Sequence, residues 1–299
     1  MKYLLSVALI VPNFLLAEDI NIIPYTALVQ YDKNENKSLK DTAQFGGLYL
    51  SLGNSGYLLE AAYSYLSVTY KNATIYEDVT QEDIYLKYSS YYENSSYKIG
   101  LHIINNSEKE NVRDLGSGFV GIIGLDAYHD LNKDKIIYGF DAYYSVYMNA
   151  YTDTNTTQTT VVDVMQVSPH LTFIKNLDKE RSNTLTLRAN LIAATQYKDR
   201  GYTSYEVEDT LYYYQIVTTL RYMWGDMKSS VTDGGMSVYN NKDLMHESYD
   251  LKVGYILSEN FVVDAKFSLN YYQEYDARNL ILLTEGYNTN TLLSLSLNF

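Results

Sequence analysis

The chain has 299 residues, no cysteine, only 3 prolines and a formal net charge of −13. Without cysteine there are no disulfides and no thiolate metal sites. The acidic balance argues against a nucleic-acid partner, and no motif for a cofactor or a metal ion is present.

The first residues predict an export signal. Met1, Lys2 and Tyr3 form a short basic start, an apolar run extends to Leu16, and Ala17 precedes two acidic residues. This pattern is typical of a secretory signal peptide, so we expect cleavage after residue 17 and export to the periplasm. Residues 18–299 show no linker and no shift in composition, which predicts one domain.

From residue 20 onward, segments of about ten residues alternate between apolar and polar side chains, as in β-strands. Short and long polar connections follow one another in turn, and 34 tyrosines supply rings suited to membrane interfaces. A soluble sandwich would place more charge on its polar faces, so we expect an all-β, single closed antiparallel transmembrane barrel. The candidate strands are 20–31, 43–53, 57–70, 82–92, 97–105, 118–129, 136–151, 160–174, 183–197, 209–224, 227–239, 248–257, 261–272 and 289–299.

The strand count depends on residues 227–239, where alternation is faint. Counting this segment as a poor strand gives about 14 strands, whereas a long surface loop would leave 13 and break the even number typical of such barrels. Twelve strands is the alternative prediction. Pro169 lacks an amide donor and marks a weak point in its strand.

The last strand carries the most specific pattern. Leu293, Leu295, Leu297 and Phe299 alternate with polar residues, and the chain stops on the phenylalanine. This segment resembles the terminal strand signal of bacterial outer-membrane β-barrels, which the barrel-assembly machinery reads. The resemblance implies a protein of the Gram-negative outer membrane, in contact with the lipid bilayer and lipopolysaccharide.

If the apolar face of each strand meets lipid, the opposite face lines the lumen. On the first strand, the apolar set runs from Ile23 to Tyr31 in steps of two. The charged and histidine residues on the opposite faces give the predicted pore lining: Glu60, Lys87, Lys98, His102, Asp126, Asp141, Arg188, Arg221, Asp250, Lys252, Asp264 and Lys266. The remaining acidic surplus is expected in loops such as 76–83 and 206–209.

Two arrangements within this lining suggest contacts. One register of the hairpin around Ser258 puts Lys252 opposite Asp264 and Asp250 opposite Lys266, which either fixes the hairpin or makes a charged wall that sorts solutes. Arg188 and Arg221 fall on strands that we expect to be adjacent, where two cations side by side would need an acid, water or an anionic solute between them. Asp126 or Asp141 could supply that partner from across the lumen.

Enzymatic activity is not expected. His246, Glu247 and Ser248 have the same-face spacing of a strand, but they lie in a loop-like region and lack the surroundings expected of outer-membrane phospholipases or deacylases. An omptin-like protease is no better supported. We therefore assign no catalytic and no metal-binding residues.

In length, strand count and apparent lack of a plug domain or infolding loop, the chain resembles the monomeric porins of the OmpG type. This resemblance implies a monomer with a water-filled lumen that passes small hydrophilic solutes or ions. A closed barrel with mutually paired charges and a structural or surface-interaction role is the first alternative. A transporter of apolar compounds of the FadL type is the second, although no N-terminal hatch of the usual size precedes the first strand.

Overall fold

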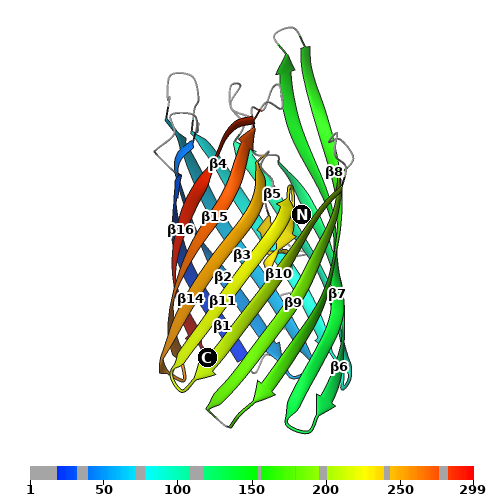
Figure 1. Cartoon of the computed structure of the whole chain (residues 1–299), viewed down its shortest axis with the longest axis vertical. Coiled ribbons are helices and arrows are strands. Elements are labelled where there is room, and N and C mark those ends of the chain that lie inside the picture. Colours follow the sequence, from blue (N-terminus) through cyan, green and yellow to red (C-terminus); the bar gives the residue numbers. More distant parts are fainter. Residues whose placement is uncertain are drawn as a thin grey trace, which may run out of the picture.

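The computed structural model describes residues 19–31, 40–71, 78–107, 117–153, 156–178, 180–194, 201–238, 243–275 and 282–299. The expected signal peptide, residues 1–17, lies outside them. Within these ranges 14 strands close into one antiparallel barrel, as predicted (Figure 1). They are β1 (Asp19–Tyr31), β2 (Lys40–Asn54), β3 (Tyr57–Tyr70), β4 (Val79–Tyr91), β5 (Ser95–Ser107), β6 (Ser117–Leu131), β7 (Asp134–Asp153), β8 (Thr156–Asn176), β9 (Arg181–Ala194), β10 (Gly201–Tyr213), β11 (Ile216–Met227), β14 (Leu244–Ser258), β15 (Phe261–Tyr275) and β16 (Leu282–Asn298).

The two ends of the chain close the barrel. β1 pairs with β16, and the amides of Ile20 and Phe299 each donate to the other residue's carbonyl at 3.0 and 2.8 Å. The short connections, such as the one at Asn54, lie at the same end as these two residues, which we call the turn end. The opposite end, where the connections are longer, is the loop end. This asymmetry is typical of outer-membrane barrels.

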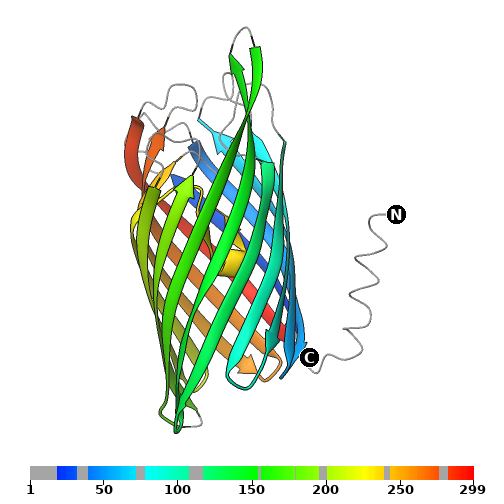
Figure 2. The same ribbon diagram turned by 90° about the vertical axis from the view of Figure 1, so that its right-hand side faces the viewer.

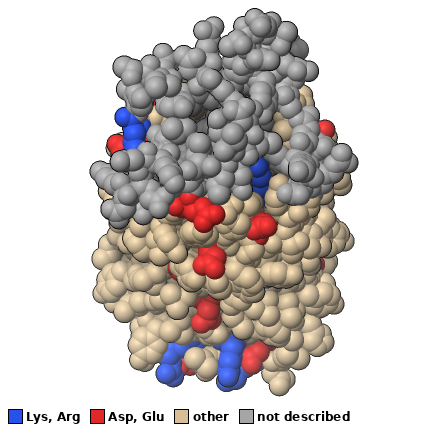
Figure 3. Space-filling view, turned by 45° about the horizontal axis from the view of Figure 1, so that its top comes forward, with Lys and Arg blue, Asp and Glu red and all other residues tan. Residues whose placement is uncertain are grey.

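Strand alternation sets which side chains face outward. On β3, Tyr63 and Tyr65 face outward and are 48% and 44% exposed. Glu60, on the opposite face of the same strand, is buried. Figure 3 shows one face of the outer wall as mostly uncharged, with isolated acidic side chains and with Lys and Arg gathered near the turn end. An outer wall of this kind suits contact with lipid.

The strand count is correct, but two errors in the sequence prediction cancel. Residues 209–224 are not one strand, because the chain reverses at Tyr214 and Gln215 between β10 and β11. Residues 206–209, expected in a loop, lie within β10. Of residues 227–239, counted as a weak wall strand, Met227 ends β11, and β12 and β13 form a separate two-stranded sheet that is not part of the barrel wall. The strand lost at one place is gained at the other.

The segment after β11 folds into the barrel. It contains β12 (Val231–Thr232), the 3-10 turn η1 (Asp233–Gly235) and β13 (Ser237–Val238), with β12 paired to β13. Lys228–Val238 is called here the luminal hairpin, and Figure 2 shows η1 enclosed between the walls of the barrel. The expected absence of an infolding loop is therefore wrong.

The first strand faces the opposite way from the prediction. Ile23, Tyr25, Val29 and Tyr31 line the luminal cavity, whereas Leu28 on the other face is 37% exposed. Both faces of β1 carry apolar residues, so apolar character alone could not orient the strand. The reversal gives the lumen an apolar wall.

Two smaller features follow from backbone chemistry. β8 continues through Pro169 without a register shift, and its ladder to β9 is interrupted there because proline has no amide donor. β7 and β8 extend through much of the expected loop 152–159 and project beyond the barrel rim (Figure 1). Among the described residues, no helix is long and apolar enough to cross a membrane.

Candidate functional site

A cavity of about 770 Å³ lies inside the barrel, between the luminal hairpin and the inner faces of β1–β5, β11 and β14–β16. The hairpin packs against the other side of the lumen. Val231 is 1% exposed in a cluster with Tyr85, Val120, Ile122 and Tyr143, which come from β4, β6 and β7. The hairpin thus divides the lumen, with the cavity on the side opposite this packed cluster.

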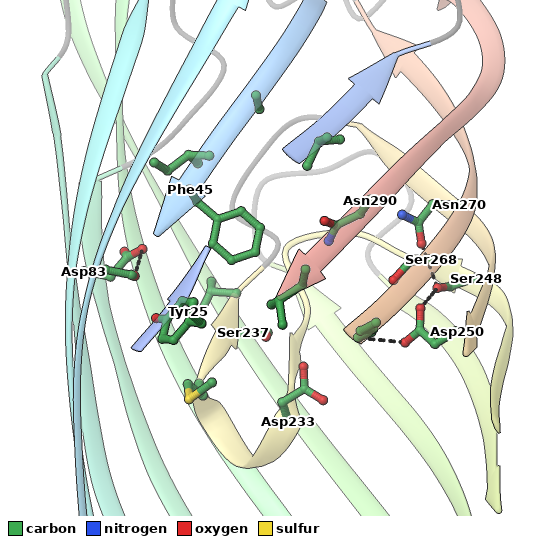
Figure 4. A pocket seen from close by; sticks show the side chains of 18 of the residues that line it. Tyr25, Phe45, Asp83, Asp233, Ser237, Ser248, Asp250, Ser268, Asn270 and Asn290 are labelled. Carbon is green, nitrogen blue, oxygen red and sulfur yellow. Dashed lines mark hydrogen bonds and ion pairs between the residues drawn. The ribbon is translucent and has the colours of Figure 1, made fainter. Parts of the chain in front are cut away.

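The walls of this cavity differ in polarity. β1–β4 contribute mainly apolar side chains, of which Val68, Ala43 and Tyr70 belong to a packed cluster with Val29 and Leu66 nearby. β14–β16 contribute a polar wall that includes Ser248, Asp250, Ser268, Asn270 and Asn290. In Figure 4 Tyr25 and Phe45 lie on one side of the cavity and this polar set on the other. The cavity is therefore amphipathic.

Hydrogen bonds fix the hairpin to the barrel wall. Gln166 of β8 donates from Nε2 to the carbonyl of Val231 and accepts from its amide, both at 2.8 Å. The Nδ1 atom of His102 lies 2.9 Å from the carbonyl oxygen of Gly235. A Cβ atom on Gly235 would lie 2.2 Å from Ile122, so only glycine permits this close approach.

A charged contact completes the attachment. Arg221 of β11 donates to Asp233 at 2.7 Å and, from Nε, to Asp250 at 2.7 Å. Enclosure in the barrel would raise the pKa of the Asp233 carboxyl, but the positive charges of Arg221 and Lys266 hold that pKa below its ordinary value. The Arg221–Asp233 ion pair is thus maintained at neutral pH.

The structure places all twelve residues of the predicted lining on the inner wall, and most of them form ion pairs. Seven line the cavity: Glu60, His102, Arg221, Asp250, Lys252, Asp264 and Lys266. The other five pair nearby. Lys87 lies 2.7 Å from Glu60, Lys98 lies 3.0 and 3.3 Å from Asp126 and Asp141, and Arg188 lies 2.9 Å from Glu206. Their role in conduction stays a prediction.

The predicted register of the β14–β15 hairpin is wrong by two residues. Lys252 lies opposite Lys266, and Asp264 lies opposite Gly254. A bulge between Ile256 and Ser258 changes the pairing near the turn. The opposite charges still meet diagonally, with Lys252 at 3.4 Å from Asp264 and Lys266 at 2.9 Å from Asp250.

The predicted pairing of Arg188 with Arg221 is also wrong. Because of the turn at Tyr214, β10 lies between their strands, with Glu206 opposite Arg188 and Glu208 opposite Arg221. Each arginine therefore has acidic neighbours on β10. The two cations are therefore not adjacent, and an anionic solute between them, one of the alternatives from the sequence, has no basis in this arrangement.

The histidine–serine pair at the loop end does not form a catalytic dyad. A bulge between Met245 and Glu247 puts Met245 and Ser248 toward the cavity, whereas the His246 ring packs on Tyr271, which neighbours the exposed Tyr287. His246 contacts Asp226 at 2.7 Å. No group of three or more potential metal ligands occurs in the described ranges.

Sequence reasoning missed the apolar wall, Asp83 and the inward course of the hairpin. One signal was available for the wall. Residues 57–70 contain Ala62, Leu66 and Val68 on the face opposite Tyr63 and Tyr65, so both faces of this strand are largely apolar. A strand that is apolar on both faces indicates that its luminal side is not in contact with bulk water.

Comparison with solved structures identifies the fold. The chain is similar to the monoaromatic hydrocarbon channel CymD, with a TM-score of 0.56, 10% identity and coverage of 95% of this chain and 89% of that one. It is also similar to the Ralstonia pickettii toluene transporter TbuX (TM-score 0.52, 8% identity, coverage 95% and 90%). The P. putida toluene transporter TodX gives a TM-score of 0.51 at 8% identity, with coverage of 94% and 89%.

At these identities the likeness shows the outer-membrane β-barrel fold alone. No protein-family model and no curated protein matches the sequence. The resemblance to OmpG-type porins is not confirmed, and the infolded hairpin removes one of the observations on which it rested.

Proposed function

We propose that the protein is an outer-membrane channel for small apolar compounds, with aromatic hydrocarbons as the first candidates. The observation that carries the proposal is the apolar wall of the luminal cavity. It is built by the inward faces of β1–β4, in a lumen that the hairpin has narrowed. This is the second alternative from the sequence, and it now has better support than the hydrophilic porin.

The size and chemistry of the cavity suit such a ligand. A volume of about 770 Å³ lies within the range of roughly 300–1,000 Å³ typical of small-molecule sites. Removing apolar surface from water contributes about 25 cal/mol per Å². A ring placed against Phe45 and Leu66 would therefore gain free energy that a sugar or an ion would not.

The structural neighbours support the same direction. CymD is named a monoaromatic hydrocarbon channel, and TodX and TbuX are named toluene transporters. The sequence analysis raised one objection to a FadL-type transporter, namely that no N-terminal hatch of the usual size precedes the first strand. In this barrel the luminal hairpin, from the connection between β11 and β14, occupies the lumen instead.

A closed barrel with a structural role is the second candidate, because the luminal charges are so extensively paired. Glu60, Asp126 and Glu206 each contact a lysine or arginine on a neighbouring strand. Such pairs stabilise the wall whether or not a solute passes. Ligand binding separates the two candidates.

Phe45→Ala provides the test. Phe45 lines the cavity next to Tyr25, at 6.2 Å between ring centroids, and losing its ring is expected to weaken toluene binding by about tenfold. Equilibrium dialysis of radiolabelled toluene against purified protein in detergent measures the affinity. Leu48→Ala is the matched control, because Leu48 lies on the same strand and is 48% exposed on the outer face. The proposal fails if the unsubstituted protein does not bind toluene or if both variants lose affinity equally.

A further inference from the structure

One acidic residue of the cavity differs from the others in its partners. Six acidic side chains line the cavity, and five of them contact a lysine or arginine: Glu60 with Lys87, Asp233 and Asp250 with Arg221, Asp243 with Lys40, and Asp264 with Lys252. Among the described residues, Asp83 is the cavity acid with no lysine or arginine within 4.0 Å. An enclosed carboxylate without a basic partner is costly in free energy.

The neighbours of Asp83 nevertheless favour a carboxylate. Gln81 donates from Nε2 to both oxygens at 2.9 Å, and the hydroxyl of Ser64 donates to Oδ2 at 3.2 Å. These donors orient both oxygens of the side chain, and neither donor carries a charge. The site thus holds a negative charge that neutral donors orient without neutralising.

His102 presents a second acceptor to the same place. Its Nδ1 atom faces the carbonyl oxygen of Gly235, which can only accept, so Nδ1 carries the proton. When the ring is neutral, Nε2 carries a lone pair, and it lies 3.5 Å from Oδ1 of Asp83. This Nε2 atom is buried and has no hydrogen-bond partner. In this form of the ring two acceptors face each other, and a ligand donor that reaches both atoms would bond to each of them.

Aromatic rings surround this pair of acceptors. The Tyr25 hydroxyl is hydrogen bonded to Ser64, which contacts Asp83, and the Tyr25 ring packs edge-on against Phe45. Tyr85 packs against the His102 ring at 6.0 Å between centroids. Figure 4 shows Tyr25, Phe45 and Asp83 on the same side of the cavity. Aromatic faces next to a carboxylate are the surroundings that an organic ammonium group favours.

We propose that Asp83 and His102 form a luminal binding site for the ammonium group of a small aromatic amine, whose ring lies against Tyr25 and Phe45. The ammonium group has three donors, enough to reach the carboxylate and the Nε2 lone pair together. Its charge neutralises Asp83. This inference rests on the proposed function and narrows its substrate class to apolar compounds that carry one cationic group.

Three probes of nearly the same shape test the charge preference. Benzylammonium, benzyl alcohol and benzoate differ in the group attached to the ring, and their affinities for the purified full chain can be measured by isothermal titration calorimetry at neutral pH. We expect benzylammonium to bind at least about tenfold more tightly than benzyl alcohol, and benzoate to bind most weakly. This comparison uses the unsubstituted protein and does not depend on the folding of a variant.

Asp83→Asn tests whether the preference for benzylammonium comes from Asp83. It is expected to lower the affinity for benzylammonium about tenfold and to leave that for benzyl alcohol within about threefold. Asp264→Asn is the matched control, because it removes the same charge from the same cavity at a carboxylate that pairs with Lys252. Asp264→Asn should change the ratio of the affinities for benzylammonium and benzyl alcohol by less than about threefold. Heat-modifiable gel mobility checks that each variant is folded.

The outcomes separate this inference from the proposed function. Equal affinities for benzylammonium and benzyl alcohol would overturn the amine site and leave the apolar channel standing. An equal loss in both variants would overturn the local role of Asp83, because the preference would then come from the general potential of the cavity. If neither benzyl alcohol nor toluene binds, the proposed function fails, and the amine site fails with it.

Discussion

Gly47 of β2 positions the aromatic wall of the cavity. The Tyr25 side chain crosses over it, and a Cβ atom at this position would lie 2.5 Å from the Tyr25 hydroxyl and 2.4 Å from the carbonyl oxygen of Tyr63. The second contact is with backbone, so it cannot be relieved by moving a flexible side chain alone. The absence of a side chain at Gly47 therefore allows Tyr25 to reach Ser64.

Gly47→Ala tests this packing. Overpacking at a tight contact costs roughly 1–3 kcal/mol, so we expect the variant to unfold at lower urea concentration and to bind toluene more weakly. Unfolding is followed by the loss of heat-modifiable gel mobility. Gly121→Ala is the matched control, since its nearest neighbour would be the Tyr144 carbonyl oxygen at an ordinary 3.8 Å. Equal stability of the two variants would contradict the packing argument.

At this scale the sequence predicted inward-facing charges well and their partners poorly. Glu60 and His102 were found because alternation fixes the face of a strand residue once its neighbours are apolar. Asp83 fell in the overlap of the candidate strand 82–92 and the expected acidic loop 76–83 and was left out of the predicted lining, whereas the structure places it within β4. The partners of Arg188 and Lys252 depended on a turn and on a bulge, neither of which alternation records.

The luminal hairpin is the element on which the proposed selectivity depends. It attaches through Gln166, His102 and Arg221, three side chains from three different strands. These contacts hold the hairpin inside the barrel, where it forms one wall of the amphipathic cavity. A barrel of the same strand count without the hairpin would be wide enough for a water-filled lumen.

Gln166→Ala should loosen the hairpin. It removes two hydrogen bonds of 2.8 Å to Val231 and leaves buried backbone groups unsatisfied, at about 1–3 kcal/mol each. Single-channel recording in a planar bilayer is expected to show larger or more frequent openings than in the unsubstituted protein. Thr172→Ala is the control, because Thr172 lies on the same strand and bonds to Thr186 rather than to the hairpin. Identical records for the two variants would show that the hairpin does not restrict the lumen.

The element boundaries show why two errors could cancel. The turn after β10 is formed by Tyr214 and Gln215, and Tyr214 has a φ of 55°, a conformation uncommon for residues other than glycine, asparagine or aspartate. The sequence there carries none of the usual turn residues, so the turn could not be predicted from it. The hairpin is rich in Ser and Gly, which indicates a loop but not the side of the wall to which it folds.

For the whole molecule, the barrel was predictable and the use of its lumen was not. The alternation of apolar and polar residues and the succession of short and long connections repeat along the chain, and the terminal strand adds a separate signal. Single errors therefore do not change the predicted architecture. The proposed selectivity depends on the connection between β11 and β14 and on the inward face of β1, and each of these features occurs once in the chain. The sequence of residues 57–70 signals an apolar inner face on one strand, but the structure was needed to show that four neighbouring strands share it.

The most direct test compares two solutes in the same cells. The protein is produced in a Gram-negative host that lacks its own general diffusion channels, and the uptake of radiolabelled toluene and arabinose is measured at low external concentration. The account predicts that toluene uptake rises severalfold over cells without the protein, whereas arabinose uptake does not change. Faster arabinose uptake with unchanged toluene uptake would contradict the account and would support a hydrophilic porin.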